Sequence, residues 1–459
     1  MAADPDNAGP PQSGTKKGPL EVALSIFADV KAGEGPMALL LMVNVFIILG
    51  AYYFLKSARE GLILSGGAMH IFGAEIGKAE VKSCSSAVQA VLLILVVIGY
   101  GQLARRMAPI KLIIAVTLFF ASHLVLFFAL DLLGVPVGIP YFIWVGIFSV
   151  TVIAQFWAFA ADVYTAEQGK RLFAIVGIGG SAGAVAGSYG VDPIVTALGE
   201  KVPPLLVIAA TLIILSLGLT ILVHRMNRRQ RAQSTATDEA DAPLDKKGGF
   251  TLLLQDRYLL YVALFILILN WVNTNGEYIL DREVTATLAP PGTTEDVARA
   301  AITRFKSEYF LWVNLIGVAA QLFAVSRILK YLDVRRALFI LPLISLGGSL
   351  MLAVLPFLTY IRIQKTAENA TDYSIMNTTK QAFWLFTTRD AKYKAKAAVD
   401  TFVVRIGDLS SALVVFVGAE LLDLSTRWFV LVNLVIIVAW IAVAVGLSRE
   451  NKKRADENA

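Results

Sequence analysis

The chain has 459 residues, of which 56% are hydrophobic and only 17% are charged, and its formal net charge is +6. Because a soluble protein carries about 25% charged residues, this composition excludes an ordinary soluble globular domain. A single cysteine, Cys84, excludes an internal disulfide and a cysteine-based metal site, and three scattered histidines exclude a histidine cluster. We expect no metal, no cofactor and no nucleic-acid partner. Since the sequence holds no P-loop, zinc motif or nucleophile elbow, we also expect no enzyme.

The apolar residues come in long blocks, such as AVQAVLLILVVIGYG and KLIIAVTLFFASHLVLFFAL. Runs of about 18 apolar residues cross a bilayer, and backbone groups in lipid must pair within helices. The sequence therefore predicts an all-α polytopic membrane protein with about twelve spans. In chain order they are 37–64, 84–103, 110–133, 139–162, 171–196, 204–224, 256–280, 306–326, 336–356, 358–386, 397–422 and 427–447.

The polar stretch 225–252 divides these spans six to six, and its composition is typical of a disordered linker. The two halves repeat similar segments: FIILGAYYFLKSARE in the first span corresponds to FILILNWVNTNGEYILDRE in the seventh. Such internal repeats are typical of secondary transporters, which hold substrate near the midplane between the halves. The predicted organisation is a tail 1–36, a half 37–224, a linker 225–252, a half 253–447 and a tail 448–459.

Clusters of lysine and arginine follow the second, sixth, eighth and twelfth spans. Short cytoplasmic loops attract such residues, and twelve spans place all four clusters on one side. Residues 1–36 contain no hydrophobic signal core. We therefore expect both termini in the cytoplasm and the protein in the inner (plasma) membrane. The polar tenth span is included because omitting it would put the basic C-terminal tail on the outer side.

Three charged residues, Lys56, Arg59 and Glu60, interrupt the first span. Each charge at the centre of a membrane helix costs roughly 2.5–3.5 kcal/mol on insertion scales, so these charges need a partner or a wet cavity. Their spacing puts them on one helical face, where Glu60 can pair with Lys56. The alternative is that they extend from the end of a long helix into the membrane interface. The seventh span has comparable charges at Glu277, Asp281 and Arg282.

The tenth and eleventh spans are also charged. Arg362, Lys365, Asn369 and Asp372 share one face of the tenth span, which predicts an aqueous cavity unless the segment is an external loop. In the eleventh span, the spacing of Arg405 and Asp408 predicts an internal pair or a cavity wall. Lys394 and Lys396 could instead be anchors at the inner interface.

The fifth span contains GIGGSAGAVAGSYG. A dinucleotide-binding loop needs a strand, a turn and a helix, and this stretch lies within a predicted membrane helix. Gly179, Gly183 and Gly187 repeat every four residues instead, which predicts a face for close helix packing.

Three segments resemble signatures of the ATP:ADP antiporter family, the nucleotide transporters of plastids and intracellular bacteria. They are FLKSAREGLI, FWAFAADVYTAEQGKRLFAIVGIGGSAG and DYSIMNTTKQAFWLFTTRDAKYKAKAAVD. In the tenth span the chain has Asn-Thr-Thr-Lys-Gln at 377–381, where nucleotide exchangers have a pattern similar to Asp-Pro-Thr-Lys-Glu. The chain thus resembles a divergent relative from a free-living bacterium, and which solute it carries stays open.

The resemblance implies a major-facilitator-like fold and exchange or import of nucleotides, or of related phosphorylated anions, by alternating access. Cations would contact phosphate, and carboxylates would hold these cations when the site is empty. Candidate substrate-binding residues are Lys56, Arg59, Glu60, Glu277, Lys380, Lys396 and Arg405, and candidate charge-pairing or coupling residues are Asp162, Glu167, Lys170, Asp400 and Asp408.

Two alternatives remain. One is proton-coupled transport of another organic solute, with Glu277 or Asp162 taking the proton. The other is a membrane receptor or scaffold that transports nothing, which would not need so many charges inside the membrane. The expected partners are the lipid bilayer and a small anionic substrate. The sequence leaves the oligomeric state open and allows a monomer.

Overall fold

A computed structural model describes residues 17–457, apart from 67–68, 72–73, 105, 232–252, 356, 385–386, 388–390 and 392–394. The described chain is almost entirely helical, as the sequence predicts, with one short addition. Strands β1 (Met69–Ile71) and β2 (Ala74–Ile76) pair antiparallel and form a hairpin after the first long helix. These strands are too short to show a period in the sequence.

The first half begins with the short helix α1 and continues with six long helices. Their bounds are α1 Pro19–Leu24, α2 Gly35–Ser65, α3 Lys78–Ala104, α4 Pro109–Leu132, α5 Gly138–Val163, α6 Ala166–Ala197 and α7 Pro204–Arg231. Helix α7 continues through the first seven residues assigned to the linker, because its charged last turns are helical although they are not apolar. The rest of the linker and residues 1–16 lie outside the described residues.

The second half consists of helical segments, several of which are joined through single π-helical turns. Their bounds are α9 Arg257–Leu288, α10 Glu295–Phe323, α11 Val325–Ala337, α12 Ile340–Val354, α13 Leu358–Thr371, η1 Asp372–Met376, α14 Asn377–Ala382, α15 Lys396–Ala398, η3 Val399–Val403, α16 Val404–Phe416, η4 Val417–Leu421 and α17 Thr426–Glu457. Helix α17 continues through most of the predicted tail 448–459.

Among the described residues, nine helices are long and apolar enough to cross a membrane. A tenth span results if α10 and α11, which are bent by 77° at their junction, are counted together. Two segments complete the predicted order of spans without meeting that criterion: α12, which has 15 residues, and the polar α13–η1–α14 segment. The tenth predicted span is therefore a helix whose polar residues conceal it from a hydropathy criterion.

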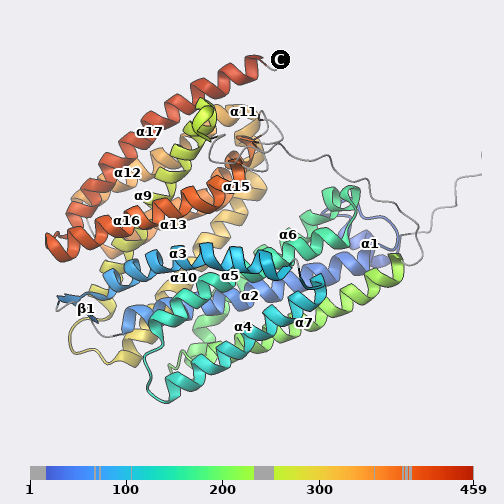
Figure 1. Ribbon diagram of the computed structural model, residues 1–459, viewed down its shortest axis with the longest axis horizontal. Helices are drawn as coiled ribbons and strands as arrows, with labels where there is room; N and C mark the ends of the chain where they lie inside the picture. Colours follow the sequence, from blue (N-terminus) through green and yellow to red (C-terminus); the bar gives the residue numbers. More distant parts are fainter. Residues whose placement is uncertain are drawn as a thin grey trace, which may run out of the picture.

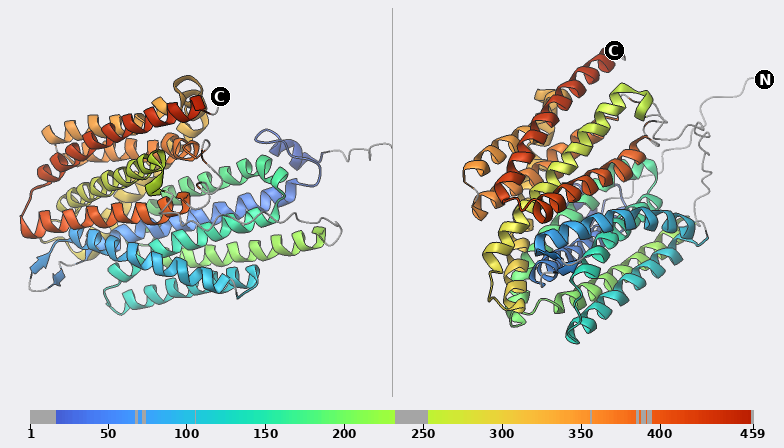
Figure 2. Two further views of the ribbon diagram at one scale, coloured as in Figure 1. Left: turned by 45° about the horizontal axis from the view of Figure 1, so that its top comes forward. Right: turned by 60° about the vertical axis from the view of Figure 1, so that its left-hand side comes forward.

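The bundle has two ends, which we call the hairpin end and the α1 end (Figure 2). Chain direction places the start of α2 and the end of α17 at the α1 end, and the β1–β2 hairpin at the opposite end. The four basic clusters all adjoin the α1 end, at the ends of α3, α7, α10–α11 and α17. They therefore share one side of the membrane, which agrees with an even number of spans.

Three hydrophobic cores hold the helices together. The first joins residues from Leu24 to Val223 with Ala300 of α10, and the second joins residues from Leu253 to Leu447. The third contains residues of both halves, for example Tyr53 of α2 and Tyr309 of α10. Figure 1 shows the two groups of helices meeting near α3 and α10 and diverging towards α1 and α11. Two separately packed halves therefore share one interface.

The glycine repeat of α6 packs directly on the backbone of α2, which confirms the close approach that its spacing predicts. A methyl group added to Gly183 would lie 2.3 Å from the carbonyl oxygen of Phe46, and one added to Gly187 would lie 2.5 Å from that of Gly50. Both oxygens belong to the backbone, so no side chain can move to make room.

We expect Gly183→Ala to lower the free energy of unfolding by about 1–3 kcal/mol, because overpacking forces the backbones of α2 and α6 apart. Gly177→Ala is the matched control on the same helix, since nothing lies within 4 Å of the added methyl group. Thermal unfolding of the purified protein in detergent measures the difference. Equal unfolding temperatures for the two variants would contradict this packing.

Candidate functional site

Lys306 lies at the centre of a buried network of ion pairs between the two halves. It is on the fourth turn of α10 and is fully buried. Its ammonium group is 2.6 Å from Asp281 Oδ1, 3.9 Å from Glu60 Oε2 and 3.8 Å from Glu277 Oε2. Asp281 and Glu277 are one helical turn apart on α9, whereas Glu60 belongs to α2. A buried cation needs several such partners to compensate for its lost hydration.

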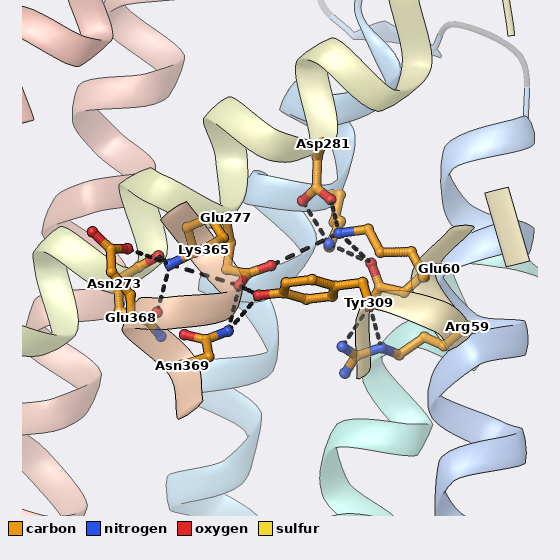
Figure 3. A network of polar contacts seen from close by, with 11 residues as sticks. Arg59, Glu60, Asn273, Glu277, Asp281, Tyr309, Lys365, Glu368 and Asn369 are labelled. Carbon is orange, nitrogen blue, oxygen red and sulfur yellow. Dashed lines mark hydrogen bonds and ion pairs between the residues drawn. The ribbon is translucent and has the colours of Figure 1, made fainter. Parts of the chain in front are cut away.

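Lys82 on α3 makes the second connection between the halves. Its ammonium group lies 2.5 Å from Asp281 Oδ2 and also donates a hydrogen bond to Glu60 Oε2. Glu60 Oε1 accepts a hydrogen bond of 2.6 Å from Arg59 Nη2, and the guanidinium of Arg59 lies 4.6 Å from the centroid of the Phe142 ring. Glu60 and Asp281 are thus shared by cations from both halves (Figure 3).

Glu277 extends the network into α13 (Figure 3). Its Oε1 accepts hydrogen bonds of 3.0 Å from the Tyr309 hydroxyl and 2.9 Å from Asn369 Nδ2, and it lies 3.7 Å from Lys365 Nζ. Lys365 also lies 3.2 Å from Glu368 Oε2. The Glu277 side chain is 27% exposed, whereas those of Glu60 and Asp281 are only 2% and 3% exposed. Glu277 is therefore the most accessible of these carboxylates.

The network pairs equal numbers of opposite charges, and Lys56 is an additional cation beside it. The paired groups are the cations Arg59, Lys82, Lys306 and Lys365 and the carboxylates Glu60, Glu277, Asp281 and Glu368. The Lys56 ammonium lies 4.0 Å from the centroid of the Phe310 ring and has no carboxylate within 4.0 Å among the described residues. The predicted Glu60–Lys56 pair is wrong, because Arg59 and Lys82 occupy the carboxylate of Glu60.

A second group of predicted residues lies on α14–α16, nearer the α1 end. Lys380 is 3.0 Å from Asp372 Oδ1, and the neighbouring Gln381 accepts a hydrogen bond of 2.8 Å from Lys396. Asp400 is exposed and interacts electrostatically with both lysines. The structure therefore brings Lys380, Lys396 and Asp400 together, separately from the network around Lys306.

Arg405 and Asp408 form the predicted internal pair, with Nη1 2.9 Å from Oδ2. The other oxygen of Asp408 accepts hydrogen bonds of 2.6 Å from Asn270 and 3.0 Å from Thr274, both on α9. This pair therefore joins α16 to α9 within the second half.

The three candidate residues on α5 and α6 lie at the α1 end, away from both groups. Glu167 is 3.0 Å from Lys31, Asp162 is exposed on the last turn of α5, and the side chain of Lys170 lies outside the described residues. The adjacent Arg171 holds Glu34 at 2.9 Å. Although burial opposes it, hydrogen bonds from Arg171, the Lys31 backbone and Gln168 hold the pKa of Glu34 below its usual range. These contacts fasten the start of α2 to α6.

Two central residues, Lys82 and Lys306, are missing from the sequence prediction. The hydropathy pattern begins the spans at 84 and 306, whereas the helices begin at Lys78 and Glu295. The sequence signal that could have found them is the presence of charged residues in the first turns of α3 and α10, next to the apolar blocks.

The polar face of α13 also differs from the prediction. Lys365 and Asn369 are buried against α9 and α10 instead of lining water, and Arg362 lies 2.6 Å from Glu308.

Hydrogen bonds and ion pairs between the halves gather at the hairpin end. Besides the network, Arg299 of α10 is 3.0 Å from Asp131 of α4, and Arg304 is 2.7 Å from Glu200, just after α6. Tyr53 donates to Asn314 Oδ1 at 2.9 Å. In the described part of the chain, no comparable bond joins the halves at the α1 end. Among the described residues, the bonds between the halves thus extend from the hairpin end to the middle of the interface, where Tyr53 contacts Asn314.

Two six-segment halves with a shared interface give this polytopic membrane protein a major-facilitator-like fold. Solved transporters have the same fold. A bacterial homologue of the human lysosomal transporter Spinster, in an inward-facing and unoccupied conformation, has a TM-score of 0.59 at 12% identity over 92% of this chain and 99% of that one. The nucleoside transporter NupG has a TM-score of 0.53 at 13% identity over 90% of this chain and 98% of that one.

The family comparison is more specific. Residues 337–451 match the family described as TLC ATP/ADP transporter. ADP,ATP carrier protein 1 of Chlamydia pneumoniae is 20% identical over 346 residues, covering 66% of this chain and 64% of that carrier. Its counterpart in Chlamydia muridarum is also 20% identical, covering 66% of this chain and 62% of the carrier. The matches thus span less than two thirds of these carriers. Together they support a divergent member of the ATP/ADP transporter family, in agreement with the motifs.

Proposed function

We propose that this protein is a secondary transporter that exchanges or imports nucleotides, or a related phosphorylated anion, by alternating access. The observation that carries the proposal is the position of Lys56 beside a buried network that joins the halves. Among the described residues, no carboxylate lies within ion-pair distance of its ammonium group. Such a cation is suited to a phosphate oxygen, which would supply the missing negative charge. The family matches support a nucleotide as that anion.

The network supports a specific closing mechanism. Glu60 and Asp281 are shared between cations of both halves, so separating the halves would leave buried charges unpaired. Breaking one side of such a buried pair costs about 3–5 kcal/mol. A bound anion that contacts Lys56 and neighbouring cations would compensate for part of the ion-pair energy lost when the halves separate. The loaded carrier would then change conformation more easily than the empty one, which is the property of an exchanger.

The remaining predicted cations are placed where substrate could pass between the α1 end and Lys56. Lys380, Lys396 and Arg405 are partly exposed on the second half. Each contacts a polar or acidic side chain, and an anion could displace it from that partner. We propose that they attract substrate on its way to Lys56. We also propose that the α1 end, which holds the four basic clusters, faces the cytoplasm of a cell bounded by its inner membrane.

The experiment is uptake into proteoliposomes of labelled ATP and ADP, with other nucleotides and sugar phosphates tested in parallel. We expect uptake of at least one nucleotide, stimulated by unlabelled nucleotide inside. Lys56→Ala should lower uptake by roughly tenfold or more, because charge-assisted hydrogen bonds contribute about 1.5–3 kcal/mol. Lys56→Arg should keep part of the activity, since its charge remains.

Lys111→Ala is the matched control, because Lys111 is an exposed lysine at the start of α4. If the folded protein takes up no nucleotide, the proposed substrate is refuted. If Lys56→Ala and Lys111→Ala take up equal amounts, the proposed role of Lys56 is refuted.

A second candidate function is proton-coupled transport, which the partial exposure of Glu277 favours. It predicts uptake driven by a pH gradient without internal substrate, and loss of that dependence in Glu277→Gln.

A further inference from the structure

A basic pocket lies at the α1 end of the second half, outside the network that joins the halves. It has a volume of about 430 Å³ and lies between α11 and the last turns of α17. Its lining includes four cations, Arg335, Arg336, Arg449 and Lys452, and a single carboxylate, Asp333. The pocket therefore carries a surplus of positive charge.

Contacts between the two helices give this pocket its shape. Asp333 holds a left-handed backbone conformation, with φ of 62°, and its carboxylate lies 2.8 Å from Arg335 Nε. The Ser448 hydroxyl on α17 donates a hydrogen bond of 3.2 Å to the Arg335 carbonyl oxygen on α11. Arg335 and Asp333 thus neutralise each other. Arg336, Arg449 and Lys452 are exposed and have no ion-pair partner among the described residues.

The surroundings of the pocket indicate the surface of a bilayer. Helix α11 bends by 77° from the spanning helix α10, and its path is interrupted again at Asp333, whose backbone is not helical. Two of the residues that line the pocket have exposed apolar side chains, Tyr331 to 73% and Leu332 to 38%. The end of α10, just before the bend, exposes Phe323 and Leu322 as well. Exposed apolar groups beside unpaired cations match the acyl chains and charged headgroups of lipid. A free phosphate would use only the cations.

We propose that this pocket binds the phosphate headgroup of an anionic phospholipid, with Arg336, Arg449 and Lys452 contacting the phosphate. Basic pockets of this kind, next to membrane helices at the surface of the bilayer, suit anionic headgroups. Because α11 and α17 belong to different spans of the second half, a bound headgroup would also hold these two helix ends together. The proposal does not depend on which solute the protein transports.

The test is native mass spectrometry of the purified protein with phosphatidylglycerol or phosphatidylcholine of identical acyl chains. The variant is Arg336→Gln/Arg449→Gln/Lys452→Gln. Its control is Lys111→Gln/Arg225→Gln/Arg228→Gln, which removes three exposed cations from the same end. We expect the wild type and the control to bind phosphatidylglycerol more tightly than phosphatidylcholine. The pocket variant should bind phosphatidylglycerol at least about tenfold more weakly, given roughly 1 kcal/mol for each cation near the surface.

Inorganic phosphate and glycerol 1-phosphate, added at millimolar concentration, distinguish a lipid headgroup from a free phosphate. We expect neither compound to displace phosphatidylglycerol, because neither offers acyl chains to the exposed apolar residues. If either compound displaces phosphatidylglycerol, the proposal that the pocket binds a lipid is wrong, and its ligand is a free phosphorylated solute. Equal retention of phosphatidylglycerol by the pocket variant, the control and the wild type would overturn the site. Size-exclusion chromatography checks that all three proteins are folded.

Discussion

Lys306→Met is expected to destabilise the protein more than any other single substitution in the buried network. The substitution leaves Asp281, Glu60 and Glu277 without the cation that lies within 4.0 Å of each of them. Removing one partner of a buried ion pair costs about 3–5 kcal/mol, because the other charge stays buried. Thermal unfolding in detergent should show this loss, and uptake into proteoliposomes should fall with it.

The control is a double variant that also removes the negative charge of Asp281, which faces Lys306. In Lys306→Met/Asp281→Asn we expect part of the lost stability to return, because one of the uncompensated carboxylates is now neutral. Lys330→Met, at an exposed lysine of α11, should have little effect. If the double variant loses the sum of both single losses, Lys306 and Asp281 are not energetically coupled.

Linking the two halves at the hairpin end is expected to abolish transport. Glu200 and Arg304 approach each other across the halves, with Oε1 2.7 Å from Nη2. Glu200→Cys/Arg304→Cys in a Cys84→Ser background can be joined by a bifunctional thiol reagent with a reducible spacer. The joined halves cannot separate at this end, so we expect at least about a tenfold loss of uptake, of the order expected when a required conformational step is blocked. Reduction of the spacer should restore uptake.

A cysteine pair within one half is the control. Glu283 and Thr426 lie at the same end on α9 and α17, and their side chains are joined by a hydrogen bond of 2.8 Å. Linking Glu283→Cys to Thr426→Cys in the same background should leave uptake unchanged, because no movement between the halves is blocked. Full activity of the linked Glu200–Arg304 pair would mean that this end stays closed during transport.

Local composition determined most of the helical architecture. A long apolar block crosses a bilayer wherever it occurs, since every backbone group must pair within its own helix. The predicted spans and the even count implied by the basic clusters depend only on such local patterns. The glycine repeat of α6 is similar, because Gly183 and Gly187 share a face through helix periodicity alone. The family motifs could also be recognised directly, since they are contiguous stretches of sequence.

The partners of the buried charges were decided by tertiary structure. Charge spacing placed Glu60 beside Lys56 on one helix, but Glu60 instead contacts Lys82 of α3 and Lys306 of α10. Those lysines are 22 and 246 residues away along the chain, and nothing in their local sequence specifies which carboxylate they meet. For the same reason, the face of α13 that carries Lys365 and Asn369 appears suited to water in the sequence and is buried in the fold. Helix periodicity establishes which residues share a face, and only the packing of distant helices determines what that face contacts.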